Sequence, residues 1–187
     1  MGGQRQRILA IDDSPFSRRR KNCACVGILS NGDVVEGVLT FNVTRDGDDA
    51  TTQIIKTLRK SRFRKLIRLL MIHSVTLAGL NVVDIREIHS ALNIPVLCIT
   101  REKPSENSLA EAIKKVFKDG ESRSEKLGAI EKAGEIKEHN KLHFQSCGIK
   151  DPMVFSILDS YKSYPWNLRL AHLIASAITD GESHGKA

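Results

Sequence analysis

The chain has 187 residues, 41% hydrophobic and 27% charged, which is typical of a single soluble domain large enough to bury a core. Lys and Arg outnumber Asp and Glu by 29 to 22, and the net charge of +7 favours a polyanionic partner such as nucleic acid. The sequence has neither the roughly 20 consecutive apolar residues of a membrane helix nor the apolar core of a signal peptide. We therefore expect one cytoplasmic domain over residues 1–187, with a disordered tail at 1–6 and a flexible tail at 181–187.

The first predicted element is a short buried strand, "RILAIDD", which ends on Asp12 and Asp13. Two runs rich in Val, Ile and Leu follow within "CACVGILSNGDVVEGVLTFNV", joined at Asn31-Gly32. Asn-Gly between such runs indicates a tight hairpin, because both turn residues must accept a positive φ. The second and third strands are therefore predicted to be antiparallel.

Helices and strands alternate in the next part of the chain. Strands separated by helices are usually parallel, so the fourth and fifth strands should run parallel to each other and to the first. A charged helical segment and two final helices complete the prediction. In chain order the later elements are a loop and helix in 46–62 with Asp48 or Asp49 near the N-cap, a strand in 66–72, a helix in 77–93 that includes Val82 and Val83, a strand in 94–100, a charged helical segment in 105–140, a segment in 141–149 that could add another strand to these five, and helices in 151–162 and 167–181.

This order predicts an α/β protein of ribonuclease H-like fold, with a mixed five-stranded sheet flanked by helices. The predicted directions bring the carboxyl ends of the first, third and fourth strands to one edge of the sheet. Several side chains that could carry chemistry would share that edge: Asp12, Asp13, Asp46, Asp48, Asp49, His73 and Ser74.

Three familiar patterns fail in their context. "ILAIDDSPFSRRR" and "REKP" imitate a receiver domain, but a hairpin rather than a helix follows the acidic pair, and the comparable later strand ends in His73. "GESHG" at 181–185 fits the serine-hydrolase pattern, but a helix precedes it where a strand is needed. A zinc site from Cys23, Cys25, His143 and Cys147 has unsuitable spacing, so the four cysteines are better interpreted as reduced core thiols.

The aspartates allow a metal site or a structural role. Magnesium binds hard oxygen ligands and keeps several waters, so a few carboxylates from different strands suffice for phosphodiester hydrolysis. Asp12 would anchor such a site, with Asp46 as the second ligand and Asp49 next. Alternatively, these residues form turns and helix caps. The structural role is preferred for Asp13, and for Asp12 and Asp46 both interpretations stay open.

Basic residues follow the acidic pair and recur after the predicted first helix. Lys and Arg clusters neutralise phosphates and give salt-sensitive, sequence-independent affinity for nucleic acid. The predicted nucleic-acid-binding residues are Arg18, Arg19, Arg20, Lys21, Arg101 and Lys103. We call a second group the basic belt: Lys56, Arg59, Lys60, Arg62, Arg64, Lys65 and Arg68.

Several segments in the same order resemble one family. The segments are "ILAIDDSPF", "VVEGVL", "DGDDAT", "TLAGLNVVDI", "IPVLCITREKP" and "LRLAHLIASAI". Together they resemble an archaeal domain-of-unknown-function family also described as endonuclease dU, and more distantly endonuclease V. The resemblance implies a ribonuclease H-like, divalent-metal-dependent endonuclease, with Mg²⁺ or Mn²⁺, that acts in DNA repair on nucleic acid carrying uracil or hypoxanthine. DNA is the more favoured nucleic acid.

The resemblance also implies roles for single residues. Asp12 matches the first metal aspartate of endonuclease V, and Arg101 stands where that enzyme has a catalytic lysine. His73 replaces an aspartate and Val43 a glutamate, with Asp46 three residues later. Histidine is a poor ligand for Mg²⁺ but is accepted by Mn²⁺. The predicted catalytic set is thus Asp12, Asp46, His73 and Arg101, and the alternative is a non-catalytic nucleic-acid-binding relative with a degenerate metal site.

Overall fold

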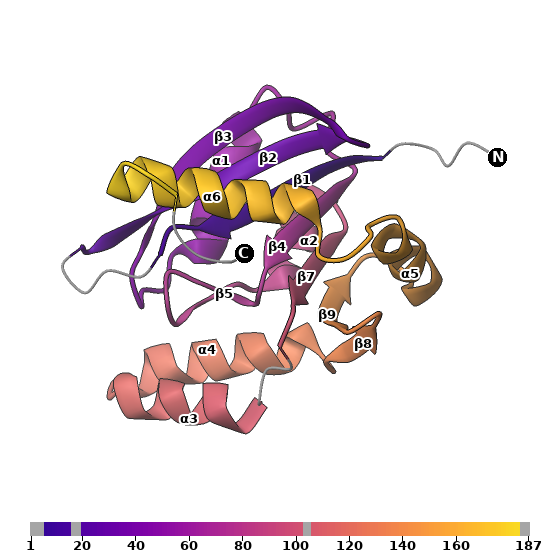
Figure 1. Ribbon diagram of the computed structural model, residues 1–187. Coiled ribbons are helices and arrows are strands. Elements are labelled where there is room, and N and C mark those ends of the chain that lie inside the picture. The colour runs from indigo at the N-terminus through magenta and orange to yellow at the C-terminus, as the bar shows by residue number, and fades with distance from the viewer. Residues whose placement is uncertain (1–5, 16–19, 103–105, 184–187) are drawn as a thin grey trace.

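A computed structural model describes residues 6–15, 20–102 and 106–183, without the side chains of 106–108. Arg18, Arg19 and Lys103, which were predicted to bind nucleic acid, lie outside the described residues. The described part is a twisted sheet with helices on both faces (Figure 1).

The main sheet has seven strands. They are β1 (Arg7–Asp13), β2 (Asn22–Asn31), β3 (Val34–Thr44), β4 (Leu69–His73), β7 (Val96–Thr100), β8 (Lys137–His139) and β9 (Leu142–Cys147). A separate two-stranded ribbon consists of β5 (Thr76–Leu77) and β6 (Asn81–Val82). The helices are α1 (Ala50–Lys60), α2 (Ile85–Leu92), α3 (Glu106–Val116), α4 (Gly120–Ala133), α5 (Asp151–Asp159) and α6 (Trp166–Asp180).

The strand order of the main sheet is β3-β2-β1-β4-β7-β9-β8. β2 is antiparallel to both β1 and β3, whereas β4 is parallel to β1 and to β7. The predicted mixed sheet and the shared carboxyl edge of β1, β3 and β4 are therefore confirmed. The sheet exceeds the predicted five strands because β9 and β8 add antiparallel strands beyond β7.

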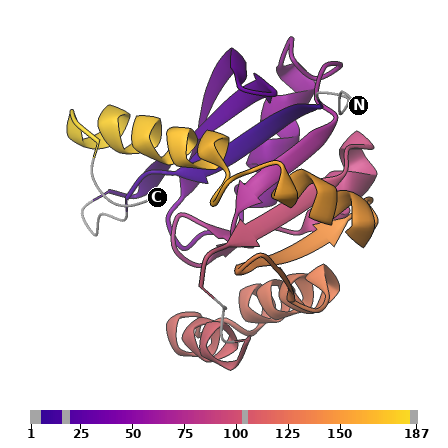
Figure 2. The ribbon, with the colours of Figure 1, turned by 45° about the vertical axis from the view of Figure 1, so that its right-hand side comes forward.

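The alternation of side chains along β1 decides which face each residue serves. Leu9 and Ile11 belong to the core under α1 and α2, whereas Ile8 and Ala10 belong to the core under α5. Figure 2 shows α6 lying across the strands on the second face, where it packs on β1 and β2. Asp12 therefore faces α6, and Asp13 faces the opposite side.

Two local predictions are corrected. Asn31 pairs with Val34 inside the ladder, so the hairpin loop is Gly32-Asp33, one residue later than predicted, and Gly32 supplies the positive φ of 59°. The helix predicted over 77–93 begins only at Ile85, because the Asp84 carboxylate caps it by accepting hydrogen bonds from the backbone of Arg86 and Glu87.

The start of α1 is stabilised from a distant part of the chain. Asp49 occupies the N-cap position, as predicted, but its side chain makes no capping hydrogen bond. Instead the amide oxygen of Asn81 accepts from the Ala50 N–H at 3.0 Å. Asn81 of the β5–β6 ribbon therefore provides an N-terminal capping hydrogen bond of α1.

The structure does not form the zinc site considered above. Cys23 and Cys25 lie on β2, while His143 and Cys147 lie on β9. The intervening strands β1, β4 and β7 put about 19 Å between the two pairs at the usual strand spacing. All four cysteines are free, and burial raises the pKa of Cys98 to about 12. None of the helices in the described ranges is long and apolar enough to cross a bilayer.

Candidate active site at the carboxyl end of β1

Asp12 is a buried acidic residue at the sheet edge. Its relative exposure is 2%, and its Oδ1 accepts a hydrogen bond from the Asp13 N–H at 2.8 Å. Within the described part of the chain, Oδ2 has no hydrogen-bond partner. A buried bare carboxylate oxygen is costly unless a positive charge compensates it.

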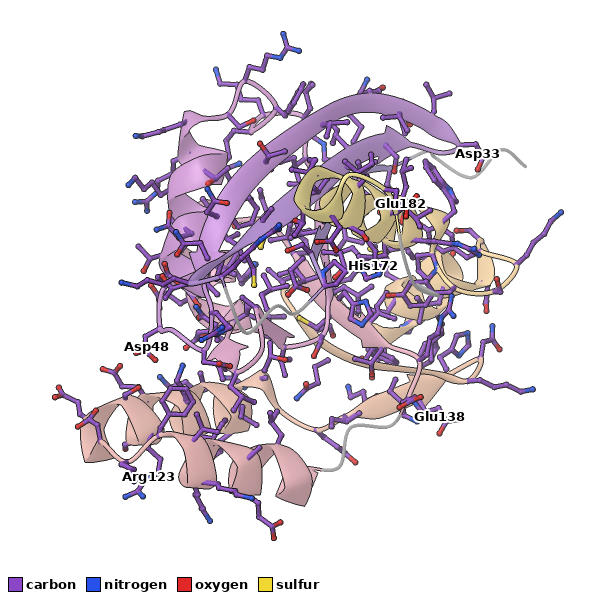
Figure 3. All side chains as sticks on the ribbon, turned by 60° about the vertical axis from the view of Figure 1, so that its left-hand side comes forward. Asp33, Asp48, Arg123, Glu138, His172 and Glu182 are labelled. Atoms are coloured by element: carbon purple, nitrogen blue, oxygen red, sulfur yellow. The ribbon has the colours of Figure 1, made fainter. Side chains whose placement is uncertain are left out.

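Two imidazoles supply such compensation. His73 Nδ1, from the end of β4, lies 3.3 Å from Asp12 Oδ2, and His172 Nδ1, from α6, lies 3.4 Å from it. These separations exceed the 2.7–2.9 Å of charge-assisted hydrogen bonds, so we regard them as ion pairs. His172, labelled in Figure 3, comes from the helix that crosses this face of the sheet.

The electrostatics of this trio favour a charged carboxylate. Burial alone would raise the pKa of Asp12, but His172 and His73 outweigh it and hold the pKa below its usual value. For His73, burial lowers the pKa, whereas the neighbouring Asp12 carboxylate outweighs burial and raises the pKa above the usual histidine value. The site therefore holds an ionised Asp12 beside a His73 imidazole that readily carries a proton.

Tyr164 and Arg101 extend the cluster toward solvent. The Tyr164 hydroxyl shares a hydrogen bond with His73 Nδ1 at 3.0 Å, and its ring lies 4.3 Å below the Arg101 guanidinium. Burial raises the pKa of Tyr164, so its phenol is neutral. Arg101 itself is exposed, which leaves its guanidinium free to meet an anion from solvent.

Asp13 serves the other face. Its Oδ2 accepts a hydrogen bond from the Ala78 N–H at 2.7 Å, in the link between β5 and β6. Burial and the neighbouring charge of Asp12 raise the pKa of Asp13 to about 7. Asp13 thus ties β1 to the β5–β6 ribbon, in agreement with the structural role preferred from the sequence.

Asp46 and Asp49 also contact the ribbon. Asp46 Oδ1 accepts from the Leu80 N–H at 2.9 Å, and its own N–H donates to the Ala78 carbonyl at 2.9 Å. Both carboxylate oxygens of Asp49 accept hydrogen bonds, from the N–H and hydroxyl of Thr44 and from the amide of Asn81. The structure brings together Asp12, His73 and, through Tyr164, Arg101, whereas the contacts of Asp46 and Asp49 are with the ribbon and with β3.

The donor set around Asp12 limits the choice of metal. The described ranges contain no group of three or more His, Cys, Asp and Glu side chains placed to hold an ion. A single ionised carboxylate with a bare buried oxygen still fits a divalent cation whose other ligands are waters and phosphate oxygens. The flanking imidazoles suit Mn²⁺ or another transition ion better than Mg²⁺.

The basic residues are placed unevenly. Arg20 lies 3.8 Å from Asp180 near the end of α6, and Lys21 is exposed. Three arginines of the basic belt, Arg59, Arg64 and Arg68, donate to backbone carbonyls. The belt spans α1 and the turn before β4, so its last members lie at the amino edge of the parallel strands, opposite Asp12.

Sequence reasoning missed His172 and Tyr164. One signal was available for His172, because it lies on the helical stripe of Leu168, Ala171 and Ala175, all fully buried. A histidine on an apolar stripe needs a polar partner in the core, and Asp12 is that partner. Tyr164 lies between two helices, where no periodicity marks it.

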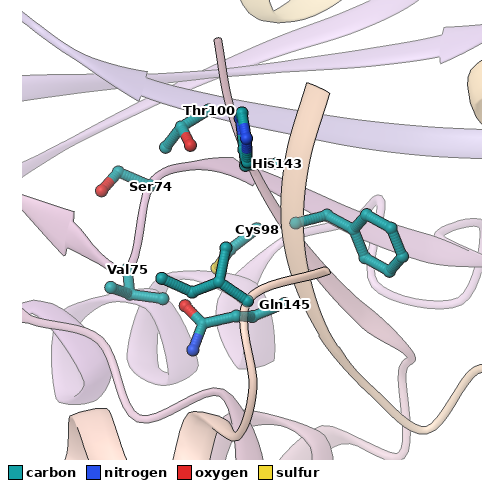
Figure 4. A pocket seen from close by; sticks show the side chains of 8 residues that line it. Ser74, Val75, Cys98, Thr100, His143 and Gln145 are labelled. Carbon is teal, nitrogen blue, oxygen red and sulfur yellow. The ribbon is translucent and has the colours of Figure 1, made fainter. Parts of the chain in front are cut away.

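A small cavity beside the site has no room for a substrate. Ser74, Thr100 and His143 line it together with Cys98 and Gln145 (Figure 4). Its volume is about 10 Å³, close to the space of one water molecule.

The profile of the family described as Endonuclease dU matches residues 4–179. The chain belongs to the endonuclease dU family. Among relatives of this endonuclease dU member, a UPF0215 protein of Thermococcus sibiricus is 39% identical, over 95% of this chain and 94% of that protein. A UPF0215 protein of Methanothermobacter thermautotrophicus is 38% identical, over 97% of this chain and 91% of that protein.

Two solved structures superimpose on this endonuclease dU protein over most of its length. A protein of unknown function from Archaeoglobus fulgidus superimposes with a TM-score of 0.85 at 31% identity, over 96% of this chain and 99% of that chain. Endonuclease V of Ciona intestinalis, in complex with a 24mer DNA containing an inosine followed by a ribo-adenosine, has a TM-score of 0.55 at 8% identity, over 90% and 83%. The predicted ribonuclease H-like fold is thereby confirmed.

Proposed function

We propose that this endonuclease dU protein is a divalent-metal-dependent endonuclease that cleaves nucleic acid, DNA in preference to RNA, near a deaminated base such as uracil or hypoxanthine. The observation that carries the proposal is the buried, ionised Asp12 with its bare Oδ2 at the carboxyl end of β1. The family description and the inosine-containing DNA of the endonuclease V complex support the choice of substrate.

The chain's own residues have separate tasks in this proposal. Asp12 holds the cation, and a bound cation would activate water and stabilise the charge that develops on the phosphate. His73 and His172 compensate the charge of Asp12 in the metal-free protein, and a bound cation would replace that compensation. Tyr164 fixes the His73 ring through their hydrogen bond, and Arg101 holds the incoming phosphate.

A second candidate is a nucleic-acid-binding protein without nuclease activity. The observation in its favour is that the described residues hold no three-ligand metal group. In such a protein the two histidines would be permanent partners of Asp12. The two candidates differ in whether any metal produces cleavage.

Cleavage of uracil-containing and hypoxanthine-containing DNA tests the proposal. We expect Mn²⁺-dependent activity that falls by at least about a hundredfold in Asp12→Asn, since the amide keeps the shape and loses the charge that holds the cation. Mn²⁺ binding, followed by titration calorimetry, should weaken in the same variant.

Asp46→Asn is the matched control. Asparagine tolerates the positive φ of 50° at this position and still accepts from Leu80, so activity should stay within a few-fold of the unchanged protein. Equal loss in both variants would support the metal pair predicted from sequence, Asp12 with Asp46. Full activity in Asp12→Asn would refute the site altogether, and binding without cleavage under every metal would favour the second candidate.

A further inference from the structure

A large cleft opens near the amino end of β1, on the same face of the sheet as Asp12. It lies between the β2–β3 turn, α5 and the segment that leads into α6, and its volume is about 870 Å³. That volume falls within the range of small-ligand sites, roughly 300–1,000 Å³. Ile8 and Ser30 of the sheet contribute to its lining, together with Gly32 and Asp33 of the turn.

The lining is rich in aromatic residues that are rare elsewhere. The chain has two tyrosines and one tryptophan, and all three, Tyr161, Tyr164 and Trp166, line this cleft. Aromatic faces bind planar rings by stacking, and nucleobases stack on them regardless of sequence. The hydroxyls of Ser156 and Ser160 add hydrogen-bonding groups at the same walls.

Hydrogen bonds from buried Asn167 fix two residues of the cleft lining, Tyr161 and Ser30. The Asn167 amide donates to the Tyr161 hydroxyl at 3.1 Å and to Ser30 Oγ at 3.2 Å, and Asn167 is fully buried. Burial also raises the pKa of Tyr161 to about 12, so its ring carries no charge. A ring fixed in this way loses little entropy when a ligand stacks on it.

Tyr164 connects the cleft to the candidate active site. It is part of the cleft lining, and its hydroxyl reaches His73 at 3.0 Å. Arg101 is exposed, and its guanidinium lies 4.3 Å from the centroid of the same ring. A strand that places a phosphate at Arg101 would therefore pass the Tyr164 ring, which also lines the cleft.

We infer that this cleft binds an unpaired nucleobase of the nucleic acid strand whose backbone passes Arg101 and Asp12. The inference rests on the proposed function for its choice of nucleic acid as the ligand. The base stacks on the aromatic lining, and the serine hydroxyls and Asp33 satisfy its polar edge. Lys162, exposed at the rim, pairs with the adjoining phosphate.

The single tryptophan provides a direct measurement. The full-length protein in EDTA is titrated with a single-stranded uracil-containing oligodeoxynucleotide while the emission of Trp166 is followed. We expect saturable quenching. A matched oligomer of equal length and charge, but with abasic sites throughout, should bind at least about fivefold more weakly and leave the emission unchanged.

A side chain that fills the cleft should abolish the difference in affinity between the base-bearing and the abasic oligomer. Ser156→Phe places a ring into the cleft from the exposed side of α5, and Ser124→Phe adds the same ring on the exposed side of α4. We expect the first variant to bind the base-bearing oligomer as weakly as the abasic one, and the second to bind as the unchanged protein does. Equal affinity for both oligomers in the unchanged protein, or no effect of Ser156→Phe, overturns the inference.

The cleavage assay separates this inference from the proposed function. Base-dependent quenching without cleavage under any metal would support base binding in the cleft and contradict the proposed nuclease activity. Asp12-dependent cleavage with an unchanged KM in Ser156→Phe would support the nuclease activity and contradict base binding in the cleft.

Discussion

The charge of Asp12 has two alternative sources of compensation, and this explains the otherwise unusual placement of two histidines. A lone carboxylate at 2% exposure would strongly destabilise the fold. The imidazoles of His73 and His172 allow the protein to fold without a cation. A cation bound at Oδ2 would repel the proton of His73, so metal binding and protonation of His73 should oppose each other.

Asp49 gives a pH-dependent prediction that does not involve Asp12. Burial raises the pKa of Asp49, but hydrogen bonds from Thr44 and Asn81 outweigh it, so the folded-state pKa lies below 3.8. This stabilisation is complete above the unfolded pKa and is lost as the pH falls through the folded value. Asp49→Asn should therefore lower the free energy of unfolding by about 1–2 kcal/mol at pH 7.

Urea unfolding at a series of pH values checks this expectation. The difference between Asp49→Asn and the unchanged protein should shrink as the pH falls below 3.8 and disappear once the pH has passed the lower folded-state pKa, where both side chains are neutral. Asp33→Asn, in the exposed β2–β3 turn, serves as the control and should show no such difference. A difference that persists at low pH would mean that the charge of Asp49 does not stabilise the fold.

At this scale the sequence predicted part of the site. Asp12 and His73 were expected together because β1 and β4 are parallel neighbours that end at one edge. Asp46 was expected with them on the same grounds, but a shared edge does not specify a shared face. The left-handed backbone at Asp46 and the bonds to the β5–β6 ribbon are tertiary features that no local pattern indicates.

The elements show where periodicity misleads. Val82 and Val83 continue the apolar pattern of α2, yet Val82 lies in β6 and pairs with Thr76. The Asp84 side chain accepts hydrogen bonds from the backbone N–H groups of Arg86 and Glu87, and this cap fixes the helix start at Ile85. The hairpin, by contrast, was predicted correctly because its turn chemistry is local, and only its register was shifted by one residue.

Lys126 fastens α4 to two loops beside the candidate site. It is 3% exposed, and its ammonium donates to the carbonyls of Gly47 and Leu80. It also pairs with Asp48 at 2.6 Å, and Figure 3 shows Asp48 on the loop nearest the α3–α4 pair. A buried ammonium with these partners holds the loop of Asp46–Asp49 against the β5–β6 ribbon.

Replacement of the Lys126 ammonium should destabilise the fold. Lys126→Met keeps most of the side-chain volume but leaves two carbonyls without their donor, so the free energy of unfolding should fall by about 1–3 kcal/mol. Lys132→Met, at a lysine 64% exposed on the same helix, should change it by less than about 0.5 kcal/mol. Similar urea midpoints for the two variants would show that the Lys126 contacts contribute little.

Across the whole molecule, the order of strands and helices was sufficient to predict the fold, because a hairpin followed by parallel units permits few arrangements. The exception is β8, whose residues Lys137–His139 are polar and lack the alternation of a half-buried strand. Its position at the edge of the sheet explains this composition. The faces that α5 and α6 cover were not predicted, and they decide which aspartate meets the histidines.

The charge of the molecule leads to a prediction about binding. With a net charge of +7, affinity for DNA should fall steadily with added salt. Arg101→Gln should reduce the slope of log affinity against log salt by about one, since it removes one phosphate contact. Fluorescence anisotropy with labelled DNA in EDTA measures the slope.

Lys114→Gln, at an exposed residue of α3, is the control and should leave the slope unchanged. Equal slopes for all three proteins would mean that Arg101 does not contact the phosphate backbone. An affinity independent of salt would contradict an electrostatic contribution from the protein surface.

The contact between β1 and α6 has a consequence for folding. Asp12 and His172 lie far apart in the sequence, so the two side chains meet only after α6 has docked on the sheet. Until α6 docks, the β1 carboxylate lacks one of its two imidazoles and the sheet lacks its cover.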